Sequence, residues 1–254
     1  MEKKKYFRGG INLELKEIRK LALDNELSIN YILKDLEISK IFKILDSKLK
    51  NTVLKGGTGI NRVYLKKENR RFSEDIDFDI YSKEDINIVK EKLHQILKEQ
   101  LKEYIVEKPR IMNETIRFDV YYTGIQKDKI KLEFKLNKGI IKNTTQKIVD
   151  YGFVPSSSAI YTTYDLEELI NQKLLAFVNR TDGKDAYDLY YLLQLEHNKQ
   201  KIKKELINKS KEKILFLLSD KKQIRYLENS INHYIPKSKR QSFVGLLQEL
   251  LNLI

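Results

Sequence analysis

Two stretches of this chain, Lys55-Gly56-Gly57-Thr58 and Arg71-Phe72-Ser73-Glu74-Asp75-Ile76-Asp77-Phe78, decide the fold that we expect. The first follows the apolar pair Val53-Leu54 and predicts a strand that turns into a helix, with glycines that let the backbone approach a phosphate closely. In the second, Asp75 and Asp77 are two residues apart, so on a strand both side chains point to the same face. A glycine turn followed by an acid pair on a second strand predicts a site that binds a triphosphate and Mg²⁺.

Apolar spacing and turn residues around these stretches predict an alternation of helices and strands. The expected elements are helices within 11–50, a strand at Val53-Leu54, a short helix over 59–67, a strand over 72–81, a helix from the Ser82–Asp85 cap toward Leu101, strands over Thr115–Tyr122 and Lys129–Leu136, a loop-rich crossover over Val149–Thr163, and helices from Asp165 onward. We therefore expect an α/β (α+β) fold with a small mixed sheet. Residues 1–150 should form its core with the N-terminal helices, and residues 151–254 a helical C-terminal domain that completes the active site.

Composition narrows the classes of protein to which the chain can belong. The 254 residues contain no Cys, which excludes a disulfide framework and a thiolate metal site. No apolar run is long enough to cross a bilayer, and the charged stretch Met1–Phe7 is followed by no apolar signal region, so we expect a cytoplasmic protein without a membrane partner. The net charge of +13 favours a polyanionic partner such as RNA, although a lysine-rich composition bias would give the same charge.

The acid pair needs a third carboxylate if it is to support two-metal phosphoryl transfer. Glu133 is the best candidate, because a neighbouring strand could place it beside Asp75 and Asp77; Asp119 is its competitor. Both point a polar side chain out of an otherwise apolar strand, which an exposed strand face would also explain. Asp79 shares the face of the pair, but we expect it at the strand end in solvent.

The glycine turn supplies the groups that we expect to bind phosphate. Gly56 and Gly57 would present backbone N–H groups to the triphosphate, and Thr58 would add a hydroxyl donor at the helix start. Ser73 lies two residues before Asp75 and could contact phosphate or metal-bound water, or satisfy local backbone instead. Three nearby arginines could neutralise phosphates: Arg62, Arg70 and Arg71.

A second group of charged residues lies between residues 168 and 190. Lys173 and Arg180 precede Asp185 and Asp188, which are three residues apart and so share one face of a helix. A lysine held near a buried acid can pair with it and also reach a phosphate as a point charge. A helix hairpin with surface ion pairs would give the same pattern.

The spacing of these charges resembles a signature of the AbiEii/AbiGii-type nucleotidyltransferase toxins, members of the polymerase-beta-like nucleotidyltransferase superfamily. That signature reads Lys, six residues, Arg, three residues, Arg-Asp, two residues, Asp, and here it falls on Lys173, Arg180, Lys184-Asp185 and Asp188. Lys184 stands where the family usually has Arg, so charge is kept and bidentate geometry is lost. The glycine motif, the Arg71–Phe78 stretch and Leu33-Lys34-Asp35-Leu36 are also similar to family motifs, and the resemblance spans residues 28–195.

The resemblance implies a polymerase-beta-like core and Mg²⁺-dependent transfer of a nucleotide from an NTP. It further implies an RNA acceptor, the tRNA 3′ end in characterised relatives, arrested translation, and a cognate antitoxin within a toxin–antitoxin or abortive phage infection system. The catalytic residues would be Asp75, Asp77, Glu133, Lys173 and Asp188. The metal ligands would be Asp75, Asp77 and Glu133. The nucleotide would be bound by Gly56, Gly57, Thr58, Ser73, Lys173 and Asp185.

Basic residues of the C-terminal helices would steer RNA to this site, unless they are simply solvated helix faces: Lys201, Lys203, Lys204, Lys221, Lys222, Arg225, Lys237, Lys239 and Arg240. Two other functions stay open. A nucleotidyltransferase of the same fold could modify a protein or a small molecule, although a charge of +13 argues against a small cationic acceptor. A non-catalytic module could bind RNA or nucleotide, but it would not need clustered metal carboxylates.

Overall fold

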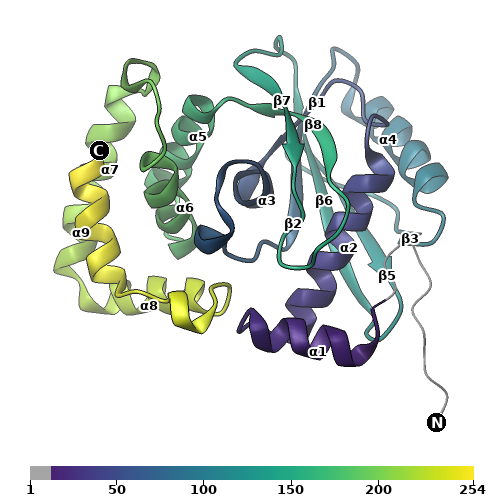
Figure 1. The fold of residues 1–254 in the computed structure, drawn as a ribbon. Coiled ribbons are helices and arrows are strands. Elements are labelled where there is room, and N and C mark those ends of the chain that lie inside the picture. The colour runs from purple at the N-terminus through teal and green to yellow at the C-terminus, as the bar shows by residue number, and fades with distance from the viewer. Residues whose placement is uncertain (1–12) are drawn as a thin grey trace.

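The computed structural model describes residues 13–254 and has the mixed α/β fold that the sequence predicts (Figure 1). The helices are α1 Leu15–Asp24, α2 Ile29–Leu45, α3 Gly56–Gly59, α4 Ile86–Gln100, α5 Leu166–Asn179, α6 Gly183–Leu193, α7 Lys204–Ser219, α8 Lys221–Asn232 and α9 Phe243–Leu253. The strands are β1 Thr52–Lys55, β2 Asp75–Tyr81, β3 Ile105–Val106, β4 Arg110–Met112, β5 Thr115–Tyr122, β6 Asp128–Asn137, β7 Thr144–Val149 and β8 Ala159–Tyr164. Helix α3 continues as a π-helical turn over Ile60–Tyr64.

Within residues 13–254 the eight strands form one mixed sheet. Their order is β3-β5-β6-β2-β1-β8-β7, with β4 paired to β5 outside this path. Strand β2 lies near the centre, antiparallel to β1 and parallel to β6. This order brings together, on one sheet, the glycine turn after β1, the acids of β2 and the polar side chains of β6.

One face of the sheet is apolar and packs against α2 and α4. Phe78 of β2, Phe118 of β5 and Phe134 of β6 point to this face and are buried with Phe42 of α2 and Leu93 of α4. Because strand side chains alternate between the two faces, the acid pair of β2 points to the opposite side. The apolar packing therefore fixes the orientation of the acids before any ligand is considered.

Helices α5–α9 form a second core beside the sheet (Figure 1). This core includes Val53 of β1, Ile60 after α3 and Tyr164 of β8, so apolar packing joins the helices to the sheet. The change from strands to helices falls after Tyr164 rather than at residue 150. The division into two domains stays a prediction. No helix within residues 13–254 combines the length and the apolar character needed to span a membrane.

Several expected elements differ from those observed. The predicted crossover over 149–163 contains most of strand β8, which pairs with the preceding strand β7. The pairing of β8 with β1 is a non-local contact that local composition does not show. The helical stretch 11–50 is two helices, and its residues 11–12 lie outside the described part. The helix after the glycine turn begins at Gly56 rather than at Gly59.

Candidate active site

The pairing of β1, β2 and β6 brings the sequence-predicted acids into one row. Asp77 lies opposite Lys55 of β1 on one side and opposite Glu133 of β6 on the other. Asp75 lies opposite Lys131, two residues earlier on each of these parallel strands. Glu133 is therefore a direct cross-strand neighbour of the acid pair, at the strand spacing of roughly 5 Å.

Asp119, the other candidate for the third carboxylate, lies one strand farther away on β5. Its side chain is 3% exposed and forms ion pairs with Arg110 at 2.6 Å, Lys129 at 2.8 Å and Arg117 at 3.3 Å. Burial alone would raise the pKa of Asp119, but the hydrogen bond from Lys129 and the charges of the three cations lower it below the ordinary value. Geometry therefore places Glu133, and not Asp119, beside the acid pair.

Negative charge is concentrated around Asp77. Burial raises the pKa of this carboxyl to about 6, and the charges of Asp75 and Glu133 add to the effect, which Lys55 and Lys173 offset only in part. A carboxylate crowded by two others favours a divalent cation, and Mg²⁺ takes carboxylate oxygen ligands of this kind.

The donor set fits Mg²⁺, but its side chains do not form a closed site. No three His, Asp or Glu side chains of residues 13–254 are arranged as a metal site. Asp75 lies 3.5 Å from the Lys131 ammonium, and Glu133 lies 3.9 Å from the Arg117 guanidinium. Coordination would require these two carboxylates to turn away from their cations toward Asp77.

Because Gly56 and Gly57 have no side chains, the backbone of the turn lies close to Asp77 and to Ser73. Gly56 has a φ of +69°, and a Cβ atom placed there would lie 2.0 Å from Oδ2 of Asp77. A Cβ atom on Gly57 would lie 2.6 Å from the Arg71 guanidinium and 2.9 Å from Oγ of Ser73. Any larger residue at either position would fill the space between the start of α3 and these side chains.

We expect Gly56→Ala to abolish nucleotidyl transfer and to destabilise the fold by about 1–3 kcal/mol, because alanine is strained at this φ and displaces Asp77. Gly59→Ala is the matched control: its φ of −60° is helical, and its Cβ would meet Leu54 at 3.3 Å. Urea unfolding and transfer assays of the two variants check this. Equal behaviour of both would contradict a special role for the first glycine.

Thr58 does not point to the phosphate side of the turn. Its side chain is 1% exposed, and its hydroxyl donates to the backbone carbonyl of Asp75. This hydrogen bond joins α3 to the start of β2. The hydroxyl of Thr58 therefore has a structural partner, whereas the sequence predicted a contact with phosphate. Ser73, by contrast, is half-buried and lines a cavity beside Asp75.

The second group of charges forms a buried cluster between α5, α6 and the segment before β2. Asp188 is 0% exposed and accepts from Nε and Nη2 of Arg71 at 2.8 and 2.6 Å. The Lys173 ammonium lies 2.8 Å from Asp188 and 3.0 Å from Asp185, and Arg180 makes a bidentate contact with Asp185. Surface ion pairs, the simpler interpretation of this pattern, are therefore excluded.

Opposite charges outweigh burial throughout this cluster. Burial would raise the pKa of Asp185, but the hydrogen bond from Arg180 and the charge of Lys173 lower it to about 2. Burial would likewise lower the pKa of Lys173, but Asp188 and Asp185 raise it above its ordinary value. All members are therefore charged at neutral pH, and Lys173 is held as a cation beside the acids of β2.

Two of the three arginines expected near phosphate are used elsewhere. Arg62 is buried against Asp35 at 2.7 Å, and Arg70 contacts Asp150 at 3.3 Å and the carbonyl of Tyr151. Arg62 joins the π-helical turn to α2, and Arg70 joins the segment before β2 to the segment after β7, so their expected contact with phosphate is not supported. The pairing could not be foreseen because each partner is distant in sequence.

The prediction that Asp79 lies in solvent at the strand end is wrong. Asp79 is buried, binds the Lys55 ammonium and accepts a hydrogen bond from the Tyr164 hydroxyl. Tyr164 belongs to β8, the strand that the sequence pattern did not show. Asp79 thus binds Lys55 rather than facing water.

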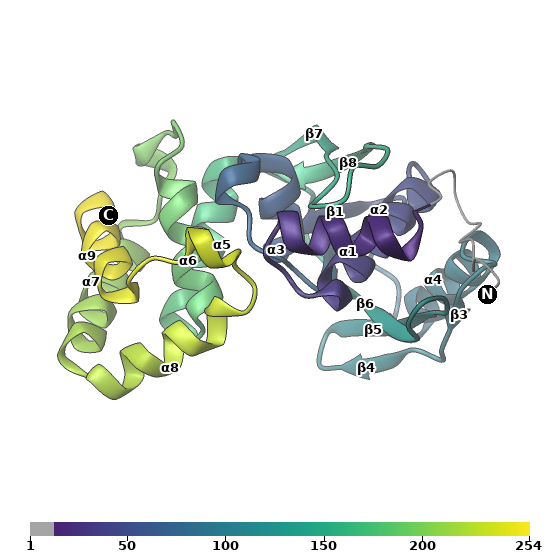
Figure 2. The ribbon, with the colours of Figure 1, turned by 60° about the horizontal axis from the view of Figure 1, so that its bottom comes forward.

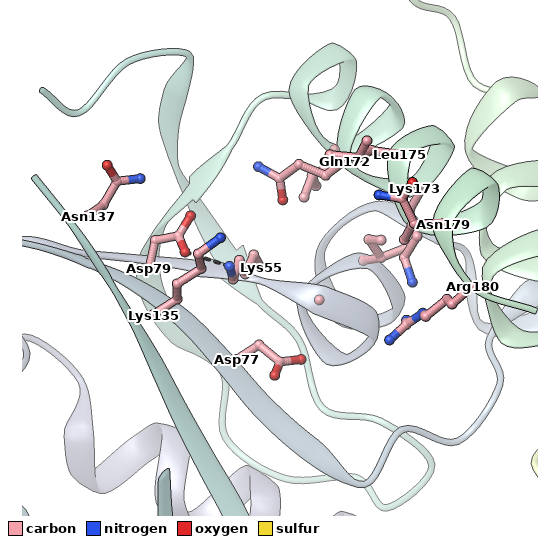
Figure 3. Close-up of a pocket in the computed structure, with 14 residues that line it drawn as sticks. Lys55, Asp77, Asp79, Lys135, Asn137, Gln172, Lys173, Leu175, Asn179 and Arg180 are labelled. Atoms are coloured by element: carbon pink, nitrogen blue, oxygen red, sulfur yellow. Dashed lines mark hydrogen bonds and ion pairs between the residues drawn. The ribbon is translucent and has the colours of Figure 1, made fainter. Parts of the chain in front are cut away.

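Two cavities meet at Asp77, Lys173 and Arg180. The larger, of about 530 Å³, lies between the strands and α5, with polar side chains facing one another across it (Figure 3). Its other polar lining residues are Lys55, Asp79, Lys135, Asn137, Gln172 and Asn179. The smaller, of about 190 Å³, is lined by Gly57, Ser73, Asp75 and Glu133. The larger has the size of a small-molecule site, and the smaller reaches the acids from the other side.

Comparison with known proteins agrees with this geometry. Residues 43–247 match the family model described as nucleotidyl transferase AbiEii toxin of type IV toxin–antitoxin systems. The chain belongs to the AbiEii family. The family confirms the resemblance seen in the sequence and makes the chain a nucleotidyltransferase of a toxin family, with an antitoxin as the second component of its system.

The fold of the chain is similar to that of a solved nucleotidyltransferase toxin. The nucleotidyltransferase toxin MenT4 (Rv2826c) from Mycobacterium tuberculosis H37Rv aligns with a TM-score of 0.62 and 15% identity, over 95% of this chain and 88% of that chain. An antigenic nucleotidyltransferase-like protein from Paracoccidioides brasiliensis aligns with a TM-score of 0.49 and 16% identity, over 82% of this chain and 95% of that chain. A search of curated protein sequences finds no significant match.

The AbiEii site also contains cations to which the sequence motifs assigned no definite role. Lys55 directly precedes the glycine turn, which is the signal that could have found it. Arg180 is 60% exposed and lines both cavities. Lys184, the departure from the AbiEii signature, lies over the Tyr234 ring at 5.0 Å and lines the smaller cavity. Its ammonium reaches the site without the paired donors of an arginine.

Proposed function

We propose that the chain is an Mg²⁺-dependent toxin that transfers a nucleotide from an NTP to the 3′ end of RNA, with tRNA as the expected acceptor. The observation that carries this proposal is the row of Lys55, Asp77 and Glu133, with Gly56 packed against Asp77. A tRNA whose 3′ end is blocked cannot be aminoacylated, so translation would stop. Such arrest suits a role in abortive phage infection.

Asp75, Asp77 and Glu133 would hold Mg²⁺, which when bound would neutralise phosphate charge and lower the pKa of the attacking hydroxyl. Glu133 assists removal of the proton from the acceptor 3′-hydroxyl. The 3′ oxygen then bonds to the α-phosphorus, the bond to the oxygen shared with the β-phosphate breaks, and pyrophosphate leaves. Each nucleotide added carries a new 3′-hydroxyl, which lies beyond the original end of the tRNA and so beyond the position that is aminoacylated.

The triphosphate would lie across the glycine turn. Backbone N–H groups of Gly56 and Gly57 face it, and Ser73 offers a hydroxyl. Lys173 and Arg180 supply positive charge from the helical side, held by Asp185 and, for Lys173, also by Asp188. The C-terminal helices would in this way complete the active site.

Incubation of the purified protein with total tRNA, Mg²⁺ and each α-³²P-labelled NTP in turn tests the proposal. We expect label in the tRNA band on a denaturing gel with at least one NTP, and none when a chelator replaces Mg²⁺. Digestion of the labelled tRNA should release the label from the 3′ end.

Label in protein or in a small molecule instead would keep nucleotidyl transfer and overturn the RNA acceptor. No label in any fraction, from a protein that binds tRNA, would favour a non-catalytic binding module.

A further inference from the structure

The face of β4, β5 and β6 next to the acids is basic. We call the set Arg110, Arg117, Lys129 and Lys131 the basic sheet face. Arg117 of β5 lies opposite Glu133, and Lys131 of β6 lies opposite Asp75. The alternation of strand side chains therefore puts these cations on the same side of the sheet as the acid pair.

Among residues 13–254, this face is partly open to solvent: Arg117 is 19% exposed, and the other three cations are more exposed. The opposite side of the same strands packs on α2 and α4, whereas Arg110 is 60% exposed, and Lys129 and Lys131 are half-buried. Strands β4 and β5 lie on the far side of the molecule from α7 and α9 (Figure 2). Arg110, Lys129 and Lys131 are thus accessible to a ligand that extends beyond the two cavities.

Asp119 organises the basic sheet face. Its buried carboxylate contacts three of the four cations, and Lys129 also lies 5.5 Å from the centre of the Tyr121 ring. Asp119 is one acid among four cations, so this face has an excess of positive charge. Asp75 and Glu133 are left out of this count because they are the proposed metal ligands. Arginines held by a buried acid are preorganised, so they lose little side-chain freedom when they bind a phosphate.

Glu133 lies between Asp77, which contacts the glycine turn, and Arg117 of the basic sheet face. Strands are roughly 5 Å apart, so Arg117 lies about one strand spacing beyond Glu133, and Arg110 about two. The donor triphosphate would occupy the glycine side, and the acceptor hydroxyl would meet Glu133. An acceptor that leaves the site on the side away from the glycine turn then passes over β6 and β5.

We propose that the basic sheet face binds the backbone phosphates of the RNA acceptor next to its 3′ end, with Asp119 as the positioning residue. The inference rests on the proposed function, since it assumes an RNA acceptor. Tyr121 would offer a ring on which an unpaired base can stack. The same cations could instead bind the NTP triphosphate, and the experiment separates these ligands.

The test compares wild type with Arg110→Gln/Lys129→Gln, in which glutamine keeps a hydrogen-bond donor for Asp119. Lys92→Gln/Lys98→Gln is the control, because it removes the same charge from exposed positions on α4, behind the sheet. Dissociation constants for tRNA are measured by fluorescence anisotropy at several salt concentrations without Mg²⁺. Dissociation constants for each NTP and thermal unfolding are measured in parallel.

We expect the first variant to bind tRNA at least tenfold more weakly and to lower the slope of log K against log salt by about 1.5, while NTP affinity stays unchanged. Arg110→Lys, which keeps the charge, should retain the wild-type slope. Equal tRNA binding by both double variants, or weaker NTP binding by the first, overturns the inference. If tRNA binds as expected but receives no label, the proposed transfer activity is contradicted, whereas the proposed binding of RNA by the basic sheet face is retained.

Should the double variant unfold below the assay temperature, Arg110→Gln alone replaces it, because this side chain is largely exposed and Asp119 keeps two partners. We then expect about half the change in slope. A slope equal to that of wild type would overturn the inference.

Discussion

Asp77→Asn should lower the rate of nucleotidyl transfer by about 1,000-fold or more. Asp77 lies between Lys55 and Glu133 and against Gly56, so its carboxylate is the central member of the proposed metal site. Loss of a metal ligand removes about 4 kcal/mol of charge stabilisation in the transition state, which corresponds to this factor. Labelled transfer to tRNA, followed over time with both proteins, measures it. A variant within tenfold of wild type would contradict the metal assignment.

The same substitution should not weaken the fold at neutral pH. The pKa of Asp77 is raised to about 6, above roughly 4 in an unfolded chain. The fold therefore favours the protonated carboxyl of Asp77. The stability gained in this way is fully present below about pH 4 and is lost as the pH rises through 6. In a chelating buffer, we expect the free energy of unfolding of Asp77→Asn to be about 2 kcal/mol higher than that of wild type at pH 7.5. At pH 4 we expect no difference between the two. Urea unfolding at both pH values checks the sign; a less stable variant at pH 7.5 would show that the carboxylate supports the fold.

Asp188→Ala should destabilise the protein by about 3–5 kcal/mol, enough to unfold a marginally stable domain. The variant leaves the Arg71 guanidinium buried without its bidentate carboxylate, and Lys173 with Asp185 as its remaining acid. A buried charge without a partner carries the full cost of its desolvation. Denaturant unfolding followed by circular dichroism measures the loss.

Two further variants separate a buried network from an ordinary ion pair. Glu205→Ala, which removes the acid of an exposed pair with Lys209, should change stability by less than about 0.5 kcal/mol. Arg71→Met/Asp188→Leu removes both charges and should recover much of the stability that Asp188→Ala loses. If Asp188→Ala costs no more than the Glu205 variant, the cluster around α6 does not stabilise the fold.

The acid pair and the glycine turn could be found from sequence because both depend on local geometry. A strand places residues two apart on one face whatever surrounds it, so Asp75 and Asp77 are paired by spacing alone. The choice between Glu133 and Asp119 could not be made in this way, because both project from neighbouring strands with the same alternation. It needed the register of β6 against β2, which is a non-local contact.

The buried cluster shows the same limit for charges. The spacing of Lys173, Asp185 and Asp188 placed them near one another, but their burial follows from the packing of α5 against α6. Arg71 reaches Asp188 across 117 residues of chain, and no local pattern indicates such a pair. Arg62 and Arg70 likewise bind partners far along the chain, in α2 and in the segment after β7.

The sequence by itself determined which strand side chains share a face, that a helix follows β1 at the glycines, and the family. Only the tertiary structure decided which strands are neighbours, which cation meets which acid, and that Asp119 and Asp79 hold cations. Periodicity within a strand or helix is set by backbone geometry over a few residues. Strand order, register and the burial of charge are set by packing between segments distant along the chain, where several pairings satisfy the same local pattern.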